Sequence, residues 1–139
     1  MDIYLSFPEE NDIIIDLKTK LRYLNYTICD SYIVTQHLDL ETMCYSEISE
    51  HIVNLFKSTS YIIVCLSLKT LKTHLQIIEM NKLLDNSFEY NNHKLIYLIT
   101  DIEYIPLLNG INNNNIYFPY YNQETSIDSF EKIVNILQL

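Results

Sequence analysis

The sequence predicts a single α/β domain over residues 1–139 with a flavodoxin-like fold, in which helices cover both faces of a five-stranded parallel sheet. Segments typical of strands and helices alternate five times along the chain. The run YIIVCLS at 61–67 is almost continuously apolar, as expected of a parallel strand covered on both faces. No linker or internal repeat divides the chain, and its length suits one domain. These observations favour right-handed crossovers and the strand order 2-1-3-4-5.

The first half of the chain is expected to supply the central strands and two helices. The predicted strands occupy 2–7, 26–30 and 61–67. Apolar residues at helical spacing predict one helix over 10–24 and another over 47–56, which could begin near Thr42. A longer connection is expected at 31–41.

The second half continues the alternation. Thr73 and Gln76 have the spacing of a capping box and predict a helix over 73–84 that carries Glu79. Further strands are expected at 94–100 and 115–120, and a last helix at 125–139. The segment 102–108 could be a short helix or a turn, and it ends at Asn109-Gly110.

The predicted topology indicates where a ligand would bind. Open α/β sheets bind ligands beyond the carboxyl ends of their strands, at the point where the strand order reverses. In the order 2-1-3-4-5 that point lies between the first and third strands. The segments that leave these strands are 7–11 and 67–73, and the second leads into the helix that carries Glu79. Glu79 is therefore expected near the crevice.

Composition and charge argue against several classes of protein. The formal net charge of −9 repels phosphates, so nucleic-acid binding is not expected. No signal peptide, membrane span or basic amphipathic stretch is visible, so we expect no membrane association. The three cysteines are widely spaced, and we expect reduced thiols and a cytoplasmic protein.

The sequence also lacks the motifs of several common catalytic sites. Gly110 is the one glycine in the chain, which excludes a P-loop and a GxGxxG dinucleotide loop. There is no GxSxG motif for a serine nucleophile. The four histidines show no metal-ligand spacing, so no metal site is expected.

Three stretches together resemble the Toll/interleukin-receptor (TIR) domain family, in the right order and over nearly the whole chain. In DIYLSF, the residues Asp2, Ser6 and Phe7 are similar to the opening strand motif of the family. The stretch EISEHIVNLFKSTSYIIVCLS resembles a helix, a Ser-rich turn and a strand that ends in Leu-Ser. THLQIIEM is similar to Ser-x-Trp-Cys-x-x-Glu, and FEKIVNIL resembles the last helix of the family.

Within THLQIIEM, Thr73 stands for the Ser of the motif, Leu75 for the Trp and Gln76 for the Cys, while Glu79 matches the Glu outright. Many TIR domains cleave the N-glycosidic bond of NAD+ in immune or defence signalling, and a glutamate at this position is their catalytic residue. The resemblance therefore implies an NAD+ glycohydrolase with Glu79 as the catalytic residue, giving nicotinamide and ADP-ribose or a cyclic product. NAD+ would be its substrate, and no cofactor is implied.

The resemblance also suggests the residues that would bind the substrate. These are Ser6, Phe7, Pro8, Ser67, Thr73 and Leu75. Two positions depart from the family pattern. Leu75 removes an aromatic wall for the nicotinamide ring, which Phe7 could replace by stacking. Pro8-Glu9-Glu10 stands where many members have an arginine, which weakens the attraction of a diphosphate.

A second function is also compatible with the sequence. Other TIR domains are non-enzymatic adaptors, so the chain could act as an adaptor or decoy through self-assembly or contacts with other TIR domains. The connection 31–41 corresponds to the BB loop of the family, and its apolar Ile33, Val34 and Leu38 could contact a neighbour or gate the crevice. Glu79 itself could be a solvated surface carboxylate, paired with Lys82.

Overall fold

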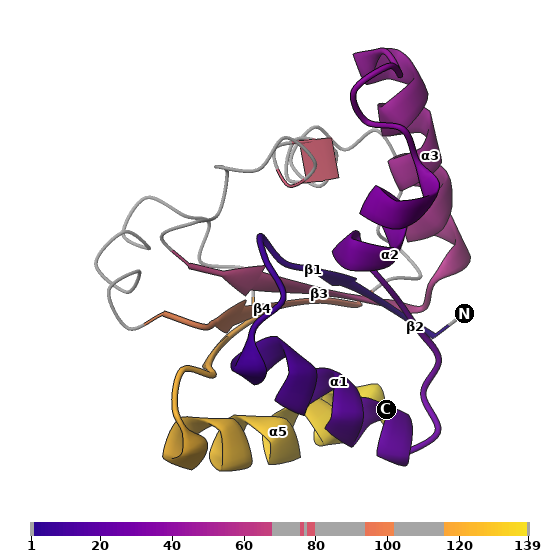
Figure 1. Ribbon diagram of the computed structural model, residues 1–139. Coiled ribbons are helices and arrows are strands. Elements are labelled where there is room, and N and C mark those ends of the chain that lie inside the picture. Colours follow the sequence, from indigo (N-terminus) through magenta and orange to yellow (C-terminus); the bar gives the residue numbers. More distant parts are fainter. Residues whose placement is uncertain (1, 68–75, 77, 80–93, 102–115, 139) are drawn as a thin grey trace.

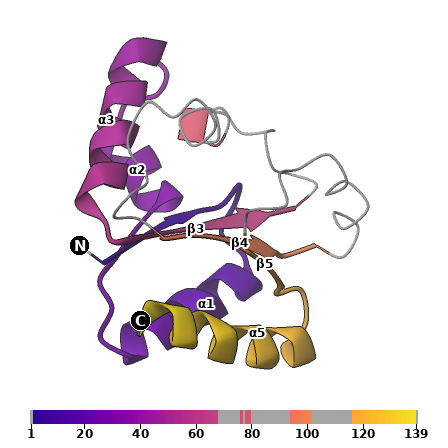
Figure 2. The same cartoon turned by 180° about the vertical axis from the view of Figure 1, so that it is seen from behind.

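The computed structural model describes residues 2–67, 76, 78–79, 94–101 and 116–138. Five parallel strands form one sheet in the order β2-β1-β3-β4-β5. Helices α2 and α3 cover one face of the sheet, and α1 and α5 cover the other (Figure 1, Figure 2). The predicted flavodoxin-like fold and its strand order are therefore confirmed.

The elements follow one another with short connections where the structure describes them. The strands are β1 (Ile3–Ser6), β2 (Ile28–Asp30), β3 (Tyr61–Leu66), β4 (Lys94–Ile99) and β5 (Ile116–Pro119). The helices are α1 (Asp12–Tyr23), α2 (Ser31–His37), α3 (Tyr45–Ser58) and α5 (Gln123–Leu137). None of the helices within the described ranges is long and apolar enough to cross a membrane.

The N-termini of three helices are capped by side chains. The side chain of Asn11 accepts a hydrogen bond from the backbone N–H of Ile14 at the start of α1, and Asp30 caps α2 in the same way. Asn122 and Thr125 form a capping box at the start of α5. These caps fix where α1, α2 and α5 leave the carboxyl ends of their strands.

Alternate side chains of the strands enter two separate apolar layers, as the pleat of a strand requires. On one face, Tyr4, Ile62 and Val64 pack against Ile52 and Phe56 of α3. The other face meets α1 and α5, and its buried residues include Ile3, Leu5, Phe7, Ile63, Cys65, Leu17 and Ile133. The face of β1 that carries Tyr4 also carries Ser6, and it is the face covered by α2 and α3.

The structure differs from the sequence-based expectation at residues 31–41. The first part of this connection is helix α2 (Ser31–His37), because Asp30 supplies a cap at its start. Val34 is buried in the core and Leu38 packs against it, so both contribute to folding of the chain itself. The other described elements agree with the predicted ones to within a few residues at their ends.

Two predicted segments fall wholly or largely outside the described residues. Of the predicted helix 73–84, the structure describes Gln76, Ile78 and Glu79, and all three are helical. They are the short pink helical piece on the same side of the sheet as α2 and α3 (Figure 1). The segment 102–108 lies outside the described residues.

Candidate functional site

Glu79 lies between the sheet and the start of α2, with a side chain that is 0% exposed. The hydroxyl of Tyr4, on β1, donates a hydrogen bond to Oε2 of Glu79. Oγ of Ser31, the first residue of α2, lies 3.1 Å from Oε1 and 3.0 Å from Oε2. The interpretation of Glu79 as a solvated surface carboxylate is therefore wrong. Its proposed partner Lys82 lies outside the described residues.

Ser31 connects three parts of the site. Its Oγ accepts a hydrogen bond from the backbone N–H of Phe7, at a distance of 3.1 Å. A backbone N–H can only donate, so the hydroxyl proton of Ser31 is left for the carboxylate of Glu79. Ser31 thus links the end of β1, the start of α2 and the buried carboxylate.

Burial is the dominant influence on the acidity of Glu79. Loss of solvent around the carboxylate raises its pKa from the usual 4.5 to about 7. Hydrogen bonds from Tyr4, Ser31 and Ser6 act in the opposite direction, since they favour the ionised form. The negative charge of Asp30 adds a small increase. Near neutral pH the carboxylate is therefore divided between its two protonation states.

Near neutral pH, Tyr4 stays a neutral hydrogen-bond donor. Burial, followed by the charge of Glu79, raises the pKa of Tyr4 well above its ordinary value of 10.0. Its ring packs edge-to-face against Phe56 of α3, with ring centroids 5.1 Å apart and an interplanar angle of 80°. This packing fixes the position from which the hydroxyl reaches Glu79.

A buried ion pair supports the start of α2 from the other side. Nζ of Lys18, on α1, lies 2.9 Å from Oδ2 of Asp30, and both side chains are almost completely buried. Burial alone lowers the pKa of Lys18, but hydrogen bonds to Glu10 and Asp30 more than offset this, so the pKa is raised overall. Because Asp30 also caps α2 through Oδ1, the ion pair helps to place Ser31.

A small surface pocket lies beside Ser31 and Glu79. It has a volume of about 120 Å³ and is lined by Phe7, Pro8, Glu9, Glu10, Ser31, Tyr32 and Thr35. Glu79 does not line this pocket, but it accepts a hydrogen bond from Ser31, which does. Two glutamates, Glu9 and Glu10, line the pocket, and the carboxylate of Glu10 is ion-paired with Lys18.

The structure brings together only part of the predicted substrate site. Ser6 is buried on the same face as Glu79, and its Oγ lies 3.5 Å from Nε2 of Gln76. Phe7 is 3% exposed and packs into the layer beneath α1, where Nζ of Lys18 lies 5.7 Å from the centre of its ring. The Phe7 ring therefore faces away from Glu79 and is not exposed for stacking.

Of the four remaining residues predicted to bind the substrate, the structure describes two. Pro8 lines the small pocket, and Ser67 follows β3 as a partly exposed residue. Thr73 and Leu75 lie outside the described residues, so their roles stay predictions.

Sequence reasoning missed Tyr4, Ser31, Asp30 and Lys18. Two signals could have found the first three. Tyr4 alternates with Ser6 and so shares its face of β1. Asp30 is the last residue of β2 and Ser31 follows it, at the edge of the sheet where the topology predicts a ligand site. The contact with Lys18 depends on how α1 packs on the sheet, for which the sequence carries no comparable signal.

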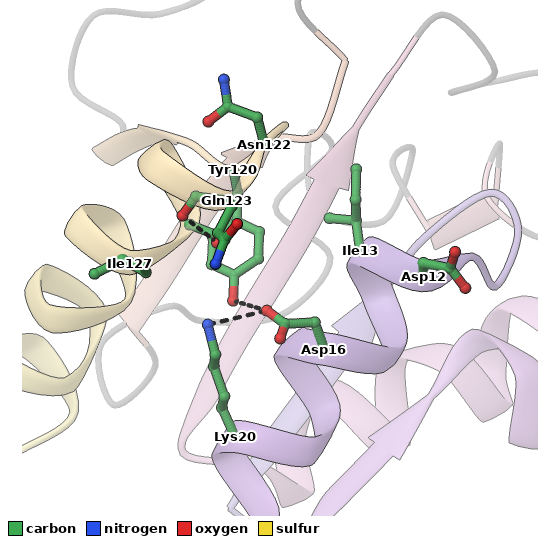
Figure 3. A pocket seen from close by; sticks show the side chains of 9 residues that line it. Asp12, Ile13, Asp16, Lys20, Tyr120, Asn122, Gln123 and Ile127 are labelled. Atoms are coloured by element: carbon green, nitrogen blue, oxygen red, sulfur yellow. Dashed lines mark hydrogen bonds and ion pairs between the residues drawn. The ribbon is translucent and has the colours of Figure 1, made fainter.

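A larger pocket of about 500 Å³ lies on the opposite face of the sheet, between α1 and α5 (Figure 3). In its wall, the hydroxyl of Tyr120 donates a hydrogen bond of 3.0 Å to Oδ2 of Asp16. Lys20 forms an ion pair with the same oxygen at 3.0 Å. None of the residues that line this pocket contacts Glu79 through a described hydrogen bond, so it is a separate feature.

Neither a metal centre nor a known relative identifies the site. Within the described ranges, no three His, Cys, Asp or Glu side chains come together as a possible metal-ligand set. Comparisons with protein-family models, with curated proteins and with solved structures found no significant match.

Proposed function

We propose that this chain cleaves the N-glycosidic bond of NAD+, with Glu79 as the catalytic carboxylate. The observation that supports this most strongly is the placement of Glu79. It is a buried carboxylate held by two hydroxyl donors, and one of them, Ser31, lines a surface pocket. A buried carboxylate with a strongly perturbed pKa beside a pocket is a feature of functional sites. The resemblance of THLQIIEM to the TIR motif points to the same residue.

The proposed reaction needs only one carboxylate. The bond between the ribose C1′ and the pyridinium nitrogen breaks, and its electron pair goes to the nitrogen, so nicotinamide leaves as a neutral molecule. Positive charge develops on the ribose, as in glycoside hydrolysis, but no acid is needed to protonate the leaving group. Water then adds to C1′ and releases one proton, which gives ADP-ribose.

Glu79 would act by stabilising the positive charge as it develops. A preformed carboxylate in a site shielded from water interacts strongly with such charge. Because its oxygens now accept from Tyr4 and Ser31, a ribose hydroxyl must replace or join one of these donors. Replacement of the Ser31 hydroxyl is the simpler change, since Ser31 already lines the pocket.

The proposed setting is the cytoplasm. All three cysteines are free thiols, with Cys29 and Cys65 buried and Cys44 exposed, and such thiols suit a reducing compartment. NAD+ would be met there as a soluble substrate.

The direct test is to incubate concentrated protein with NAD+ and follow the release of nicotinamide. We expect release by the wild-type protein and its loss in Glu79→Gln, which keeps the shape of the side chain and removes its charge. Glu131→Gln is the matched control, since it makes the same chemical change at an exposed position on α5. Undiminished release by Glu79→Gln would overturn the assignment.

A second candidate function is association with copies of the same chain or with other TIR domains. Two observations favour it over catalysis: the Glu79 carboxylate is fully enclosed, and the neighbouring pocket of about 120 Å³ is small for a ligand site. Light scattering over a range of protein concentrations tests this function. Assembly without nicotinamide release, under crowded conditions as well, would favour the association module over the enzyme.

A further inference from the structure

The hydrogen bonds around Glu79 come from two different elements and converge on one carboxylate. Tyr4 approaches from β1, and its hydroxyl proton goes to Oε2. Ser31 approaches from α2 and lies within 3.1 Å of both oxygens, so its single proton serves either one. Both donors are themselves held in place, Tyr4 by Phe56 and Ser31 by the backbone N–H of Phe7.

We propose that Tyr4 and Ser31 are positioning residues for Glu79: their hydroxyls fix the orientation of its carboxylate and hold it ready to act as an anion. This inference rests on the proposed function, because it gives the two hydroxyls a role in the reaction assigned to Glu79. It also has a consequence that does not depend on the substrate. Removal of either hydroxyl must make the ionised carboxylate less favourable, since a donor to the charged form is lost.

The other polar groups around Glu79 favour its ionised form less than these donors do, or oppose it. Ser6 also favours the ionised form of Glu79, but less than Tyr4 or Ser31 does. Asp30 and the thiol of Cys29 are the neighbouring titratable groups on β2. The charge of Asp30 opposes ionisation of Glu79, and it is balanced by the ion pair with Lys18. The two hydroxyls therefore stand as the main described groups that favour the anion.

The substitutions Tyr4→Phe and Ser31→Ala remove one hydroxyl each with little change of shape. A hydrogen bond to a charged group stabilises that group by an amount that corresponds to about one pKa unit. We therefore expect the acid dissociation constant of Glu79 to fall roughly tenfold in Tyr4→Phe. A fall in the same direction is expected in Ser31→Ala. Tyr120→Phe is the matched control, because it also removes a buried hydroxyl that donates to a carboxylate, on the opposite face of the sheet.

The experiment measures the titration of Glu79 itself, by carbon-13 NMR of protein labelled at the glutamate carboxyl carbons. The signal is assigned by its absence from Glu79→Gln. In Tyr4→Phe and in Ser31→Ala we expect the pKa of Glu79 to rise above the wild-type value, whereas Tyr120→Phe leaves it unchanged. If Tyr4 served packing alone, Tyr4→Phe would lower the stability of the protein without moving this titration.

Parallel measurements of nicotinamide release separate the two proposals. If the wild-type protein releases no nicotinamide and the pKa of Glu79 still rises in the variants, the proposed function fails but the two hydroxyls remain positioning groups. The positioning role is overturned if the wild-type protein is active but neither variant changes the pKa of Glu79 or the pH dependence of nicotinamide release. Ser31→Ala keeps this test available if Tyr4→Phe does not fold.

Discussion

Oγ of Ser31 lies 3.0 Å from Oε2 of Glu79, although 48 positions separate the two residues in the chain. The contact joins the first turn of α2 to a carboxylate that follows β3, across the point where the strand order reverses. It also places a fully buried acid next to a residue that lines a surface pocket. The acidity of Glu79 depends on that arrangement, and so does the activity proposed for it.

The raised pKa of Glu79 makes stability depend on pH. Between the usual value of 4.5 and about 7, the folded state keeps a proton that the unfolded state has lost. The free energy of unfolding therefore falls as pH rises through this range, by up to about 3 kcal/mol from this one group. Urea unfolding at pH 5, 6, 7 and 8 measures the effect.

In Glu79→Gln this contribution is absent, so the difference in stability between the variant and the wild-type protein must change with pH. We expect the variant to gain relative to wild type as the pH rises from 5 to 8. Glu131→Gln, at an exposed site, should track the wild type across the series. A constant difference between Glu79→Gln and wild type would contradict the raised pKa.

The ion pair between Lys18 and Asp30 is expected to matter far more than the surface ion pairs. Lys18→Met leaves the buried carboxylate of Asp30 without its partner, and such a change costs about 3–5 kcal/mol. Lys132→Met is the control, because Lys132 pairs with Asp128 on the exposed face of α5. This variant should lose less than about 1 kcal/mol of unfolding free energy. Denaturant unfolding of both variants compares them, and equal losses would refute the structural role of the buried pair.

Asn25 should tolerate glycine and resist branched side chains. Its φ of 68° lies in the left-handed region, where a residue with a β-carbon is strained and glycine is not. We expect Asn25→Gly to keep the wild-type melting temperature within a few degrees, and Asn25→Val to lose about 1–2 kcal/mol. Thermal unfolding checks both. A valine variant as stable as wild type would show that the turn can change its backbone conformation.

The fold could be predicted because its signals are local. The apolar run at 61–67 and the helical stripe at 10–24 correspond to β3 and α1, and their alternation restricts the topology. The sequence does not predict helix α2, because the apolar residues at 31–41 also fit a loop that faces a partner or the crevice. Asp30, which caps the start of α2, fits the end of a strand equally well in the sequence.

The candidate site could be predicted only in part. The position of Glu79 near the reversal of strand order followed from topology, but its burial did not, since an amphipathic pattern leaves residues at the edge of the stripe ambiguous. The contacts with Tyr4 and Ser31 depend on the register in which Leu5 lies opposite Asp30. The direction of the Phe7 ring follows from the same pleat, which places it with Leu5 beneath α1.

The pH dependence of nicotinamide release tests most directly whether the ionised carboxylate of Glu79 drives the cleavage of NAD+. We predict that kcat/KM rises about tenfold per pH unit below a midpoint near pH 7 and is constant above it, because only the ionised form stabilises the developing charge. In Glu79→Gln this rise should disappear together with the activity. A wild-type profile that is flat or falls between pH 5 and 8 would contradict the central role of Glu79.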